Sequence, residues 1–191
     1  MKENKVALGH TDPSTDASRP LPSPGGERLT GLAPVVSEGT VVLVLGSFPG
    51  AASLRAGQYY AHPQNHFWRI LQALWPQHPL PGAAHYGERC DWLLARGLGL
   101  WDVYASCERV GSLDTRIRNA QVNDFASLRA RCPRLAAIAH NGGESFKHAR
   151  STALLGVAVH RLPSTSPANA SWSFERKLNA WAELLARHGL V

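Results

Sequence analysis

Cysteine is scarce in this 191-residue sequence, and long apolar runs are absent. The three cysteines, Cys90, Cys107 and Cys132, are widely spaced and form no C-x-x-C pair. This spacing argues against a zinc site or an iron–sulfur cluster and favours a reducing compartment. No apolar run approaches the roughly 18 residues that a membrane span needs, and the N-terminus lacks the apolar core of a signal peptide. We therefore expect a cytoplasmic protein with no metal, no other cofactor and no membrane partner.

Two common catalytic signatures are missing as well. The sequence has no Gly-Lys-Ser/Thr after its first glycine-rich turn, so a nucleoside-triphosphate site is not expected. It also has no G-x-S-x-G, and no Ser–His–Asp order is evident. An α/β hydrolase that would use Ser47 or Ser164 as its nucleophile is therefore only a minor alternative.

Acidic side chains are outnumbered by basic ones. The chain has 20 Lys and Arg against 14 Asp and Glu, a formal net charge of +6 and a pI near 9.7. Residues 1–39 hold four Lys/Arg and five Asp/Glu, a net of −1, so the remainder carries +7. A basic domain favours a polyanionic partner, although a basic surface can also be merely a solvated one.

The chain divides into a leader and one domain. Residues 1–39 are rich in Pro, Gly, Ser, Thr and Asp without an apolar period, and we interpret them as a disordered leader. From residue 40 onward, apolar β-branched runs alternate with helical apolar periods, which predicts a single domain over residues 40–191. The expected strands are 41–46, 99–105, 134–140 and 156–163, and the expected helices are 65–75, 88–97, 123–132, 144–155 and 173–189.

This alternation predicts an α/β fold with three layers, αβα, around a central four-stranded, mostly parallel sheet. Sites in such folds gather in the loops at the carboxyl ends of the strands. Polar segments follow the expected strands here: "GSFPG", "DVYASC", "HNGG" and "PSTSPANAS". We expect the functional site among these loops.

The segment "YYAHPQNHFW", after the first strand, is dense in aromatic and hydrogen-bonding side chains. Tyr60, in the loop, can stack on a nucleic-acid base. Phe67 and Trp68, at the end of the segment, belong to the apolar stripe of the expected helix and are expected in the core. Asn65 suits a helix cap, and it can hold a water as well if its carbonyl oxygen is exposed.

Four further features could contact a ligand. Asp102 follows two large apolar residues in an expected strand, so its carboxylate needs partners, which a ligand or a structural hydrogen bond to a neighbouring loop would supply. The glycines around Ser47 allow close backbone approach to an anion, or only a tight turn. "HNGGESFK" would form an anion-binding helix start with His140, Asn141 and Lys147. "PSTSPANAS" is a stiff polar loop, suited to phosphate contacts in a groove or to a rigid turn that caps the last helix.

In this order the segments resemble the uracil-DNA glycosylase superfamily. "GSFPG" sits where the first motif of those enzymes follows strand one. "AHPQNHFW" is similar to the "AHP-x-N-x-FW" segment of the mismatch-specific uracil and thymine glycosylases, and "LPSTSPANAS" resembles the second motif, a Pro/Ser-rich minor-groove loop. The most similar branch is that of the hypoxanthine-DNA glycosylases, in which "HPxNHFW" and "PSTSPAN" occur in this form. The resemblance covers about residues 40–188.

The sequence departs from the superfamily at both motifs. Most members carry Asp or Asn at the third position of motif one, where it activates or positions water, and this sequence has Phe48 there. Motif two often supplies His or Asn to the leaving base, and Ser164 occupies that place. In the branch that this sequence resembles, the Asn of "NHFW" takes over, so the resemblance makes Asn65 the catalytic candidate. The iron–sulfur families need four cysteines, and this chain has three.

The resemblance implies a monofunctional DNA glycosylase of base excision repair. Such an enzyme flips a deaminated base, hypoxanthine or uracil, out of the duplex and hydrolyses its N-glycosidic bond. Asp102 takes the position of an Asn that reads uracil in related families, and it would accept the ring N–H that both bases share; stabilising the sugar cation is its alternative role. The expected base-binding residues are Ser47, Phe48, Tyr60, Asp102 and Asn141. The expected DNA-binding residues are Ser53, His66, Lys147, Ser164, Ser166, Asn169 and Ser171.

The expected partner is double-stranded DNA that contains a damaged base, with single-stranded DNA as the alternative. We expect a monomer that acts on the bacterial nucleoid. The main rival is a module that binds damaged or single-stranded DNA and has lost catalysis, because motif one lacks its usual water-positioning residue. That module would release no free base.

Overall fold

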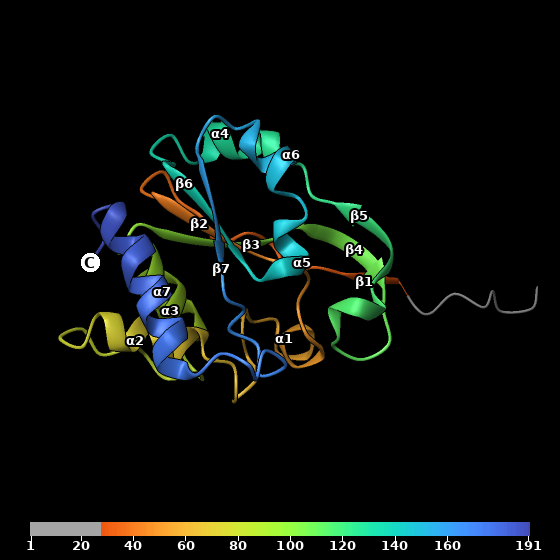
Figure 1. Cartoon of the computed structure of the whole chain (residues 1–191), viewed down its shortest axis with the longest axis horizontal. Coiled ribbons are helices and arrows are strands. Elements are labelled where there is room, and N and C mark those ends of the chain that lie inside the picture. The colour runs from red at the N-terminus through yellow and green to blue at the C-terminus, as the bar shows by residue number, and fades with distance from the viewer. Residues whose placement is uncertain (1–27) are drawn as a thin grey trace, which may run out of the picture.

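The computed structural model describes residues 28–191 and has a four-stranded parallel sheet at its centre (Figure 1). The strand order is β3-β2-β6-β7. The strands are Val42–Gly46 (β2), Leu98–Asp102 (β3), Ala137–Asn141 (β6) and Ala158–Leu162 (β7). All three pairings are parallel, so the four carboxyl ends lie at one edge of the sheet.

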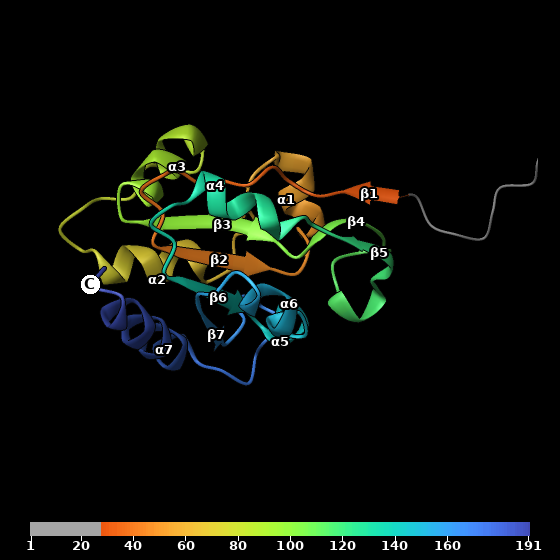
Figure 2. The ribbon, with the colours of Figure 1, turned by 90° about the horizontal axis from the view of Figure 1, so that it is seen from above.

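Helices cover both faces of this sheet (Figures 1 and 2). One face is covered by α2 (Phe67–Leu74), α3 (Tyr86–Leu94) and α7 (Phe174–Arg187). The other is covered by α4 (Leu128–Arg131) and α6 (Ala149–Ala153). Two short helices, α1 (Ala51–Ala56) and α5 (Gly143–Phe146), follow strands at the carboxyl edge. The predicted three-layer αβα fold with a four-stranded parallel sheet is confirmed.

Successive side chains of β2 enter two different cores. Val44 packs in one cluster with Phe67 and Trp181, while Leu45 packs on the opposite face in a cluster with Leu128, and all of these are fully buried. A strand that is buried on both faces needs an apolar side chain at every position, which explains the unbroken run "VVLVLG". Within residues 28–191, no helix combines the length and apolar character that a membrane span requires.

A second sheet, small and antiparallel, lies beyond the carboxyl end of β3 (Figure 1). Its strand order is β1-β4-β5, with β1 at Arg28–Thr30, β4 at Tyr104–Glu108 and β5 at Arg118–Val122. The prediction of one strand over 99–105 is therefore wrong at its end. The N–H of Val103 donates to the Gly46 carbonyl (2.9 Å), and the chain then leaves the parallel sheet as β4. Every residue of β5 is exposed, so that strand has no apolar signal in the sequence.

The folded domain begins earlier than predicted. Residues 28–30 form β1, Val35 bridges to Leu100, and the Tyr59 hydroxyl donates to the carbonyls of Leu32 and Ala33 (3.2 Å each). The predicted disordered leader is thus wrong for residues 28–39, where scattered apolar side chains dock on the core without a periodic pattern. Residues 1–27 of that leader lie outside the described residues.

Two of the expected helices are shorter than predicted. The expected helix 123–132 is a 3₁₀ turn at Phe125–Ser127 followed by α4, and its cap is Asp124, whose Oδ1 accepts the Ala126 N–H (2.9 Å), rather than Asn123. The side chain of Asn123 instead donates to the Asp102 carbonyl (2.9 Å). The expected helix 144–155 is split into α5 and α6 at His148, whose ring nitrogen bonds the Tyr104 hydroxyl (3.0 Å).

Candidate active site

A cavity of about 960 Å³ opens at the carboxyl edge of the parallel sheet. The strand register places Gly46 beside Asp102, and Asn141 beside Leu162, so the last residues of all four strands reach its walls. Of the predicted site residues, this cavity brings together Ser47, Phe48, Ser53, Tyr60, Asn65, Asp102, Asn141, Ser164, Ser166 and Asn169. His66, Lys147 and Ser171 lie outside it.

Asp102 is the buried carboxyl group of this cavity. It is 4% exposed, and its Oδ2 has no hydrogen-bond partner among residues 28–191. Burial, with a smaller contribution from Asp114 and opposed by Arg109, raises the pKa of Asp102 to about 8. A buried polar atom without a partner is costly, so its retention in a cavity wall suits a group that a ligand satisfies.

Tyr60 and Phe48 supply the aromatic walls. The Tyr60 ring stacks on Phe67, with centroids 4.0 Å apart and planes at 24°, which leaves its other face toward the cavity that it lines. Its backbone has φ 55°, a left-handed conformation that is uncommon for a residue with a side chain. Phe48 is 5% exposed, and the guanidinium of Arg109 lies 5.0 Å from its ring centroid. Both rings are therefore held rigidly before any ligand enters.

Asn65 lies at the start of α2 and both caps the helix and lines the cavity. Its Oδ1 accepts the N–H of Phe67 (3.0 Å), so the capping role is realised, and the side chain remains half-buried rather than enclosed. A carbonyl oxygen has two acceptor positions, and the cap uses one of them. The second can accept from a water in the cavity.

Asn141 and Thr165 form a two-bond clamp between β6 and the loop after β7. The Asn141 amide donates to Thr165 Oγ1 (2.9 Å), and its oxygen accepts the N–H of Thr165 (3.0 Å). The N–H of His66 in turn donates to the Thr165 carbonyl (3.0 Å), which joins the Asn65 segment to the same loop. Thr165 is fully buried, and sequence analysis overlooked it within the Ser/Thr-rich loop. One N–H of the Asn141 amide remains for a ligand.

The loop 163–173 is stiffened by its own polar side chains. Ser164 Oγ accepts the N–H of Ser166 (3.2 Å), Ser166 Oγ accepts that of Ala168 (3.2 Å), and Asn169 Nδ2 donates to the Ser164 carbonyl (3.0 Å). These local turns, with two prolines, fix the loop at the mouth of the cavity. Ser171, on the same loop, is exposed and donates to Asn169 Oδ1 (3.2 Å).

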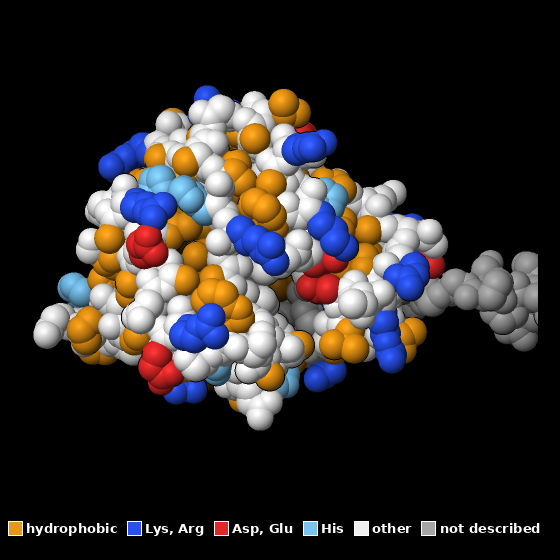
Figure 3. Space-filling model, in the orientation of Figure 1, with side chains coloured by type: hydrophobic (Ala, Val, Ile, Leu, Met, Phe, Trp, Pro, Cys, Tyr) orange, Lys and Arg blue, Asp and Glu red, His pale blue; other side chains and the backbone are white. Residues whose placement is uncertain are grey.

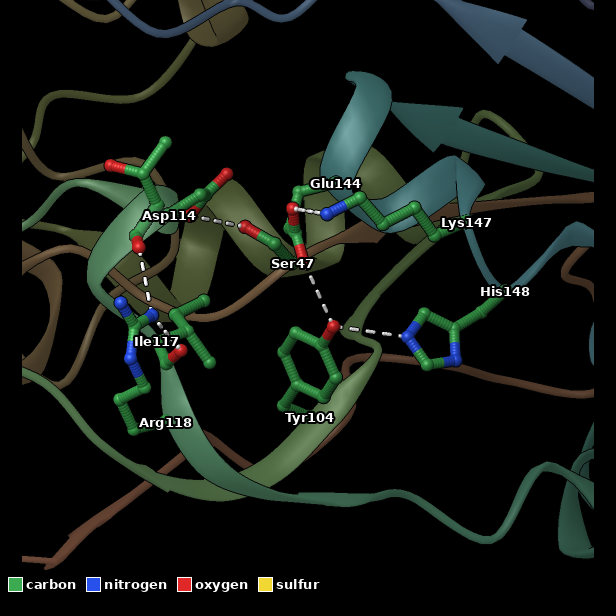
Figure 4. Close-up of polar contacts among 9 residues, drawn as sticks. Ser47, Tyr104, Asp114, Ile117, Arg118, Glu144, Lys147 and His148 are labelled. Carbon is green, nitrogen blue, oxygen red and sulfur yellow. Dashed lines mark hydrogen bonds and ion pairs between the residues drawn. The ribbon is translucent and has the colours of Figure 1, made fainter.

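Asp114 is a second carboxylate of the cavity that the sequence did not reveal. It comes from the connection between β4 and β5, and its Oδ1 accepts the Ser47 hydroxyl at 2.8 Å (Figure 4). Burial raises the pKa of Asp114, and the Ser47 hydrogen bond opposes that rise. A carboxylate thus reaches the motif-one turn from another loop, beside the position where Phe48 replaces the usual Asp or Asn. No local pattern around Asp114 distinguishes it from other loop acids.

Lys147 lies beyond the cavity in a separate polar network (Figure 4). Its ammonium pairs with Glu144 (2.6 Å), which also accepts the Tyr104 hydroxyl (3.0 Å), and His148 completes the chain on Tyr104. Of the expected anion-binding helix start, Asn141 and the first residue of α5, Gly143, line the cavity, whereas His140 is fully buried. The His140 ring forms hydrogen bonds with the hydroxyls of Ser145 (2.7 Å) and Thr152 (2.9 Å). These bonds make a buried network that holds the end of β6.

Two more residues predicted to contact DNA, Ser53 and His66, lie in other places than the open surface of the main cavity. Ser53 lines the cavity but is 5% exposed, and its Oγ accepts the N–H of Ala61 (3.2 Å), so it holds the loop before Asn65. His66 faces a second cavity on the far side of the loop 163–173. On the face of the molecule drawn in Figure 3, Lys and Arg side chains are spread singly, with hydrophobic and other side chains between them. Within residues 28–191, no group of three or more His, Cys, Asp or Glu side chains is arranged to hold a metal ion.

Comparison with known proteins agrees with this geometry. The model of the uracil DNA glycosylase superfamily matches residues 33–185. A hypoxanthine DNA glycosylase of Methanosarcina barkeri is 35% identical over 82% of this chain and 98% of its own, and one of Methanosarcina acetivorans is 34% identical over 83% and 98%.

A solved structure agrees as well. A solution NMR structure of a Methanosarcina acetivorans protein, which carries the provisional name uracil DNA glycosylase, superposes with a TM-score of 0.73 at 31% identity, and the match covers 85% of this chain and 99% of that one. The predicted resemblance is confirmed by the family model, the curated relatives and the fold. This chain belongs to the uracil DNA glycosylase superfamily.

Proposed function

We propose that this DNA glycosylase removes deaminated bases, hypoxanthine and uracil, from DNA by hydrolysing the N-glycosidic bond. One observation carries the proposal. A single cavity at the strand ends is lined by the half-buried amide of Asn65, by the buried carboxyl of Asp102 with its unpaired Oδ2, and by the rigid ring of Tyr60. The relatives named hypoxanthine DNA glycosylases support the choice of substrate class.

The target base must enter the cavity to be cleaved, because its C1′ bond is inaccessible within the stacked duplex. Unstacking costs a few kcal/mol, and contacts of the basic surface and the loop 163–173 with phosphates offset that cost. A cavity of about 960 Å³ admits a purine as well as a pyrimidine. Tyr60 stacks on the base, and Phe48 closes the opposite side.

Asp102 selects the base by its charge. Hypoxanthine and uracil both present a ring N–H beside a carbonyl, and an ionised carboxylate accepts that N–H. Adenine and cytosine present a bare ring nitrogen, whose lone pair would face the negative charge. An unpaired buried group gives strong discrimination, so the parent bases are refused. Because the pKa of Asp102 is about 8, the selective ionised form is the minor one at neutral pH.

Asn65 positions the attacking water. Its Oδ1 is fixed by the Phe67 N–H, so the amide points in one direction before the substrate arrives. An amide is a poor base, and the chemistry therefore depends on electrostatic stabilisation. The remaining N–H of Asn141 and the backbone N–H groups around Ser47 take charge on the departing base, while Asp114, which also lines the cavity, favours the sugar cation.

The reaction is hydrolysis without strand cleavage. A glycosylase that also cleaves the strand uses an amine to form a Schiff base. Among the described residues that line the cavity there is no Lys, and the one cationic side chain is Arg161. The product is therefore a free base and an intact strand with an abasic site.

Excision assays on duplexes that each carry one lesion test this proposal. We expect free hypoxanthine and free uracil from the corresponding duplexes, none from undamaged adenine or cytosine, and a nick only after alkali treatment. Tight binding with no free base from any lesion would support instead a DNA-binding module without catalysis, which the Phe48 substitution in motif one makes the second candidate.

A further inference from the structure

A second cavity, of about 510 Å³, lies on the other side of the loop 163–173 from the proposed base pocket. Three residues of the loop region, Pro167, Asn169 and Trp172, line both cavities. A linear polymer that places one unit in the first cavity and the adjacent unit across the loop would therefore contact the second cavity.

Lys177 is the unusual member of this second cavity. It belongs to the first turns of α7, the whole residue is 1% exposed, and it lines the cavity. Its ammonium makes one long hydrogen bond, to the Ser166 carbonyl (3.4 Å), and no carboxylate of residues 28–191 lies within ion-pair distance. An ammonium has three donors, so a buried cation is left with unused N–H groups and no counter-charge.

The neighbouring basic side chains, Arg69 and His66, contact an aromatic ring rather than an acid. The guanidinium of Arg69, which also lines the cavity, lies 4.7 Å from the ring centroid of Phe174, and His66 meets the same ring edge-on (5.4 Å). A stacked guanidinium keeps its in-plane N–H groups free for an anion. Burial and the charges of Lys177 and Arg69 lower the pKa of His66. Glu175, at the start of α7, is the acidic residue nearby; its side chain is exposed, and its charge opposes the lowering of the His66 pKa.

We propose that this second cavity binds a backbone phosphodiester of the DNA strand next to the flipped nucleotide, with Lys177 and Arg69 as its charge partners. The inference rests on the proposed function for its DNA substrate, but it concerns binding and not the excised base. A phosphate oxygen supplies the acceptors that Lys177 lacks. It also fixes the strand on both sides of the loop, so that the nucleotide between the two cavities is held at the pocket mouth.

Salt-dependent binding of an undamaged duplex tests the inference. Lys177→Met keeps the length of the buried side chain and removes its charge. We expect roughly fivefold weaker binding near physiological salt and a slope of log K against log [NaCl] that is smaller by about one. The matched control is Arg134→Met, at the amino-terminal end of the sheet away from both cavities, which should keep the wild-type affinity at low salt within about a factor of two.

A second variant distinguishes a loss of DNA binding from a folding defect. Arg69→Met changes an exposed side chain of the same cavity and should lower the affinity and the slope in the same direction. An unchanged salt slope in both variants, with wild-type melting temperatures, overturns the proposal. A shift of melting temperature without a change of slope also overturns it, because it assigns Lys177 a role in the fold alone. Failure of the proposed function would show instead as DNA binding without base release by the wild-type protein.

Discussion

The carboxyl group of Asp102 lies against the backbone of Gly46. A β-carbon on Gly46 would come within 2.3 Å of Asp102 Oδ1, and the two residues are register partners at the ends of β2 and β3. The place of the proposed base-reading group thus depends on the absence of a side chain on the neighbouring strand.

Gly46→Ala should therefore remove activity by displacing Asp102. The new methyl group cannot coexist with Oδ1, so the carboxyl must rotate away or the strand ends must separate. We expect at least a tenfold loss of kcat/KM for an inosine-containing duplex, about 1.4 kcal/mol of transition-state stabilisation. Gly87→Ala is the control, because a β-carbon there meets nothing within 4 Å. Equal activity of Gly46→Ala and Gly87→Ala would contradict the account.

The pH dependence of excision should report the ionisation of Asp102. The ionised carboxylate is the form that accepts the base N–H, and its pKa is raised to about 8 by burial. We expect kcat/KM for hypoxanthine to rise with pH, about tenfold per unit below pH 7.5, and to level off above pH 8. The rise should disappear in Asp102→Asn, whose substrate preference should also change. A rate that falls from pH 6.5 to 8 would mean that the neutral acid reads the base.

The same group should make the wild-type fold less stable as pH rises. The unfolded pKa of Asp is about 3.9, so between about pH 4 and pH 8 the unfolded state releases a proton that the folded state retains. Stability falls across that window and changes no further above it. Asp102→Asn should therefore raise the free energy of unfolding at pH 8 by on the order of a few kcal/mol. In denaturant titrations the gain should shrink toward zero near pH 4, and a gain that does not depend on pH would argue against an ionisable cause.

Removal of the Thr165 hydroxyl should loosen the loop 163–173. Thr165→Val keeps the shape of the side chain and leaves the Asn141 amide without its buried acceptor. Such an unpaired group costs about 1–3 kcal/mol, and the loss should be accompanied by weaker binding of damaged DNA. Thr30→Val, on an exposed strand position, serves as the control in thermal unfolding and in binding assays. Equal melting temperatures for the two variants would remove the clamp from the account.

The sheet and the main cavity-lining residues could be predicted because they depend on local signals. Unbroken apolar runs marked the buried strands, and polar residues directly after them marked the carboxyl edge where Asp102 and Asn141 line one cavity. The dual position of Asn65, as helix cap and cavity residue, followed from its place before an amphipathic helix.

What could not be predicted depends on long-range contacts. Asp114 reaches Ser47 across 67 residues, and no local pattern announces that pairing. Strand β5 pairs with β4 although all its residues are exposed, so its position comes from backbone and side-chain hydrogen bonds, such as that from Ser106 Oγ to Gln121 Oε1 (2.9 Å), and not from apolar burial. Lys177 stands three residues after Phe174 and four before Trp181, on the apolar face of α7, but the sequence does not show that the loop residue Ser166 supplies the hydrogen-bond acceptor for its ammonium.

The catalytic assignment of Asn65 is the central claim, and single-turnover excision from an inosine-containing duplex tests it most directly. Asn65→Ala removes both the cap and the water-holding oxygen, whereas Asn65→Asp keeps an oxygen that can accept the Phe67 N–H. Asn179→Ala, at an exposed position of α7, is the control. We predict that excision falls at least a hundredfold in Asn65→Ala, persists in Asn65→Asp and is unchanged in Asn179→Ala. Wild-type excision by a folded Asn65→Ala protein would contradict the account.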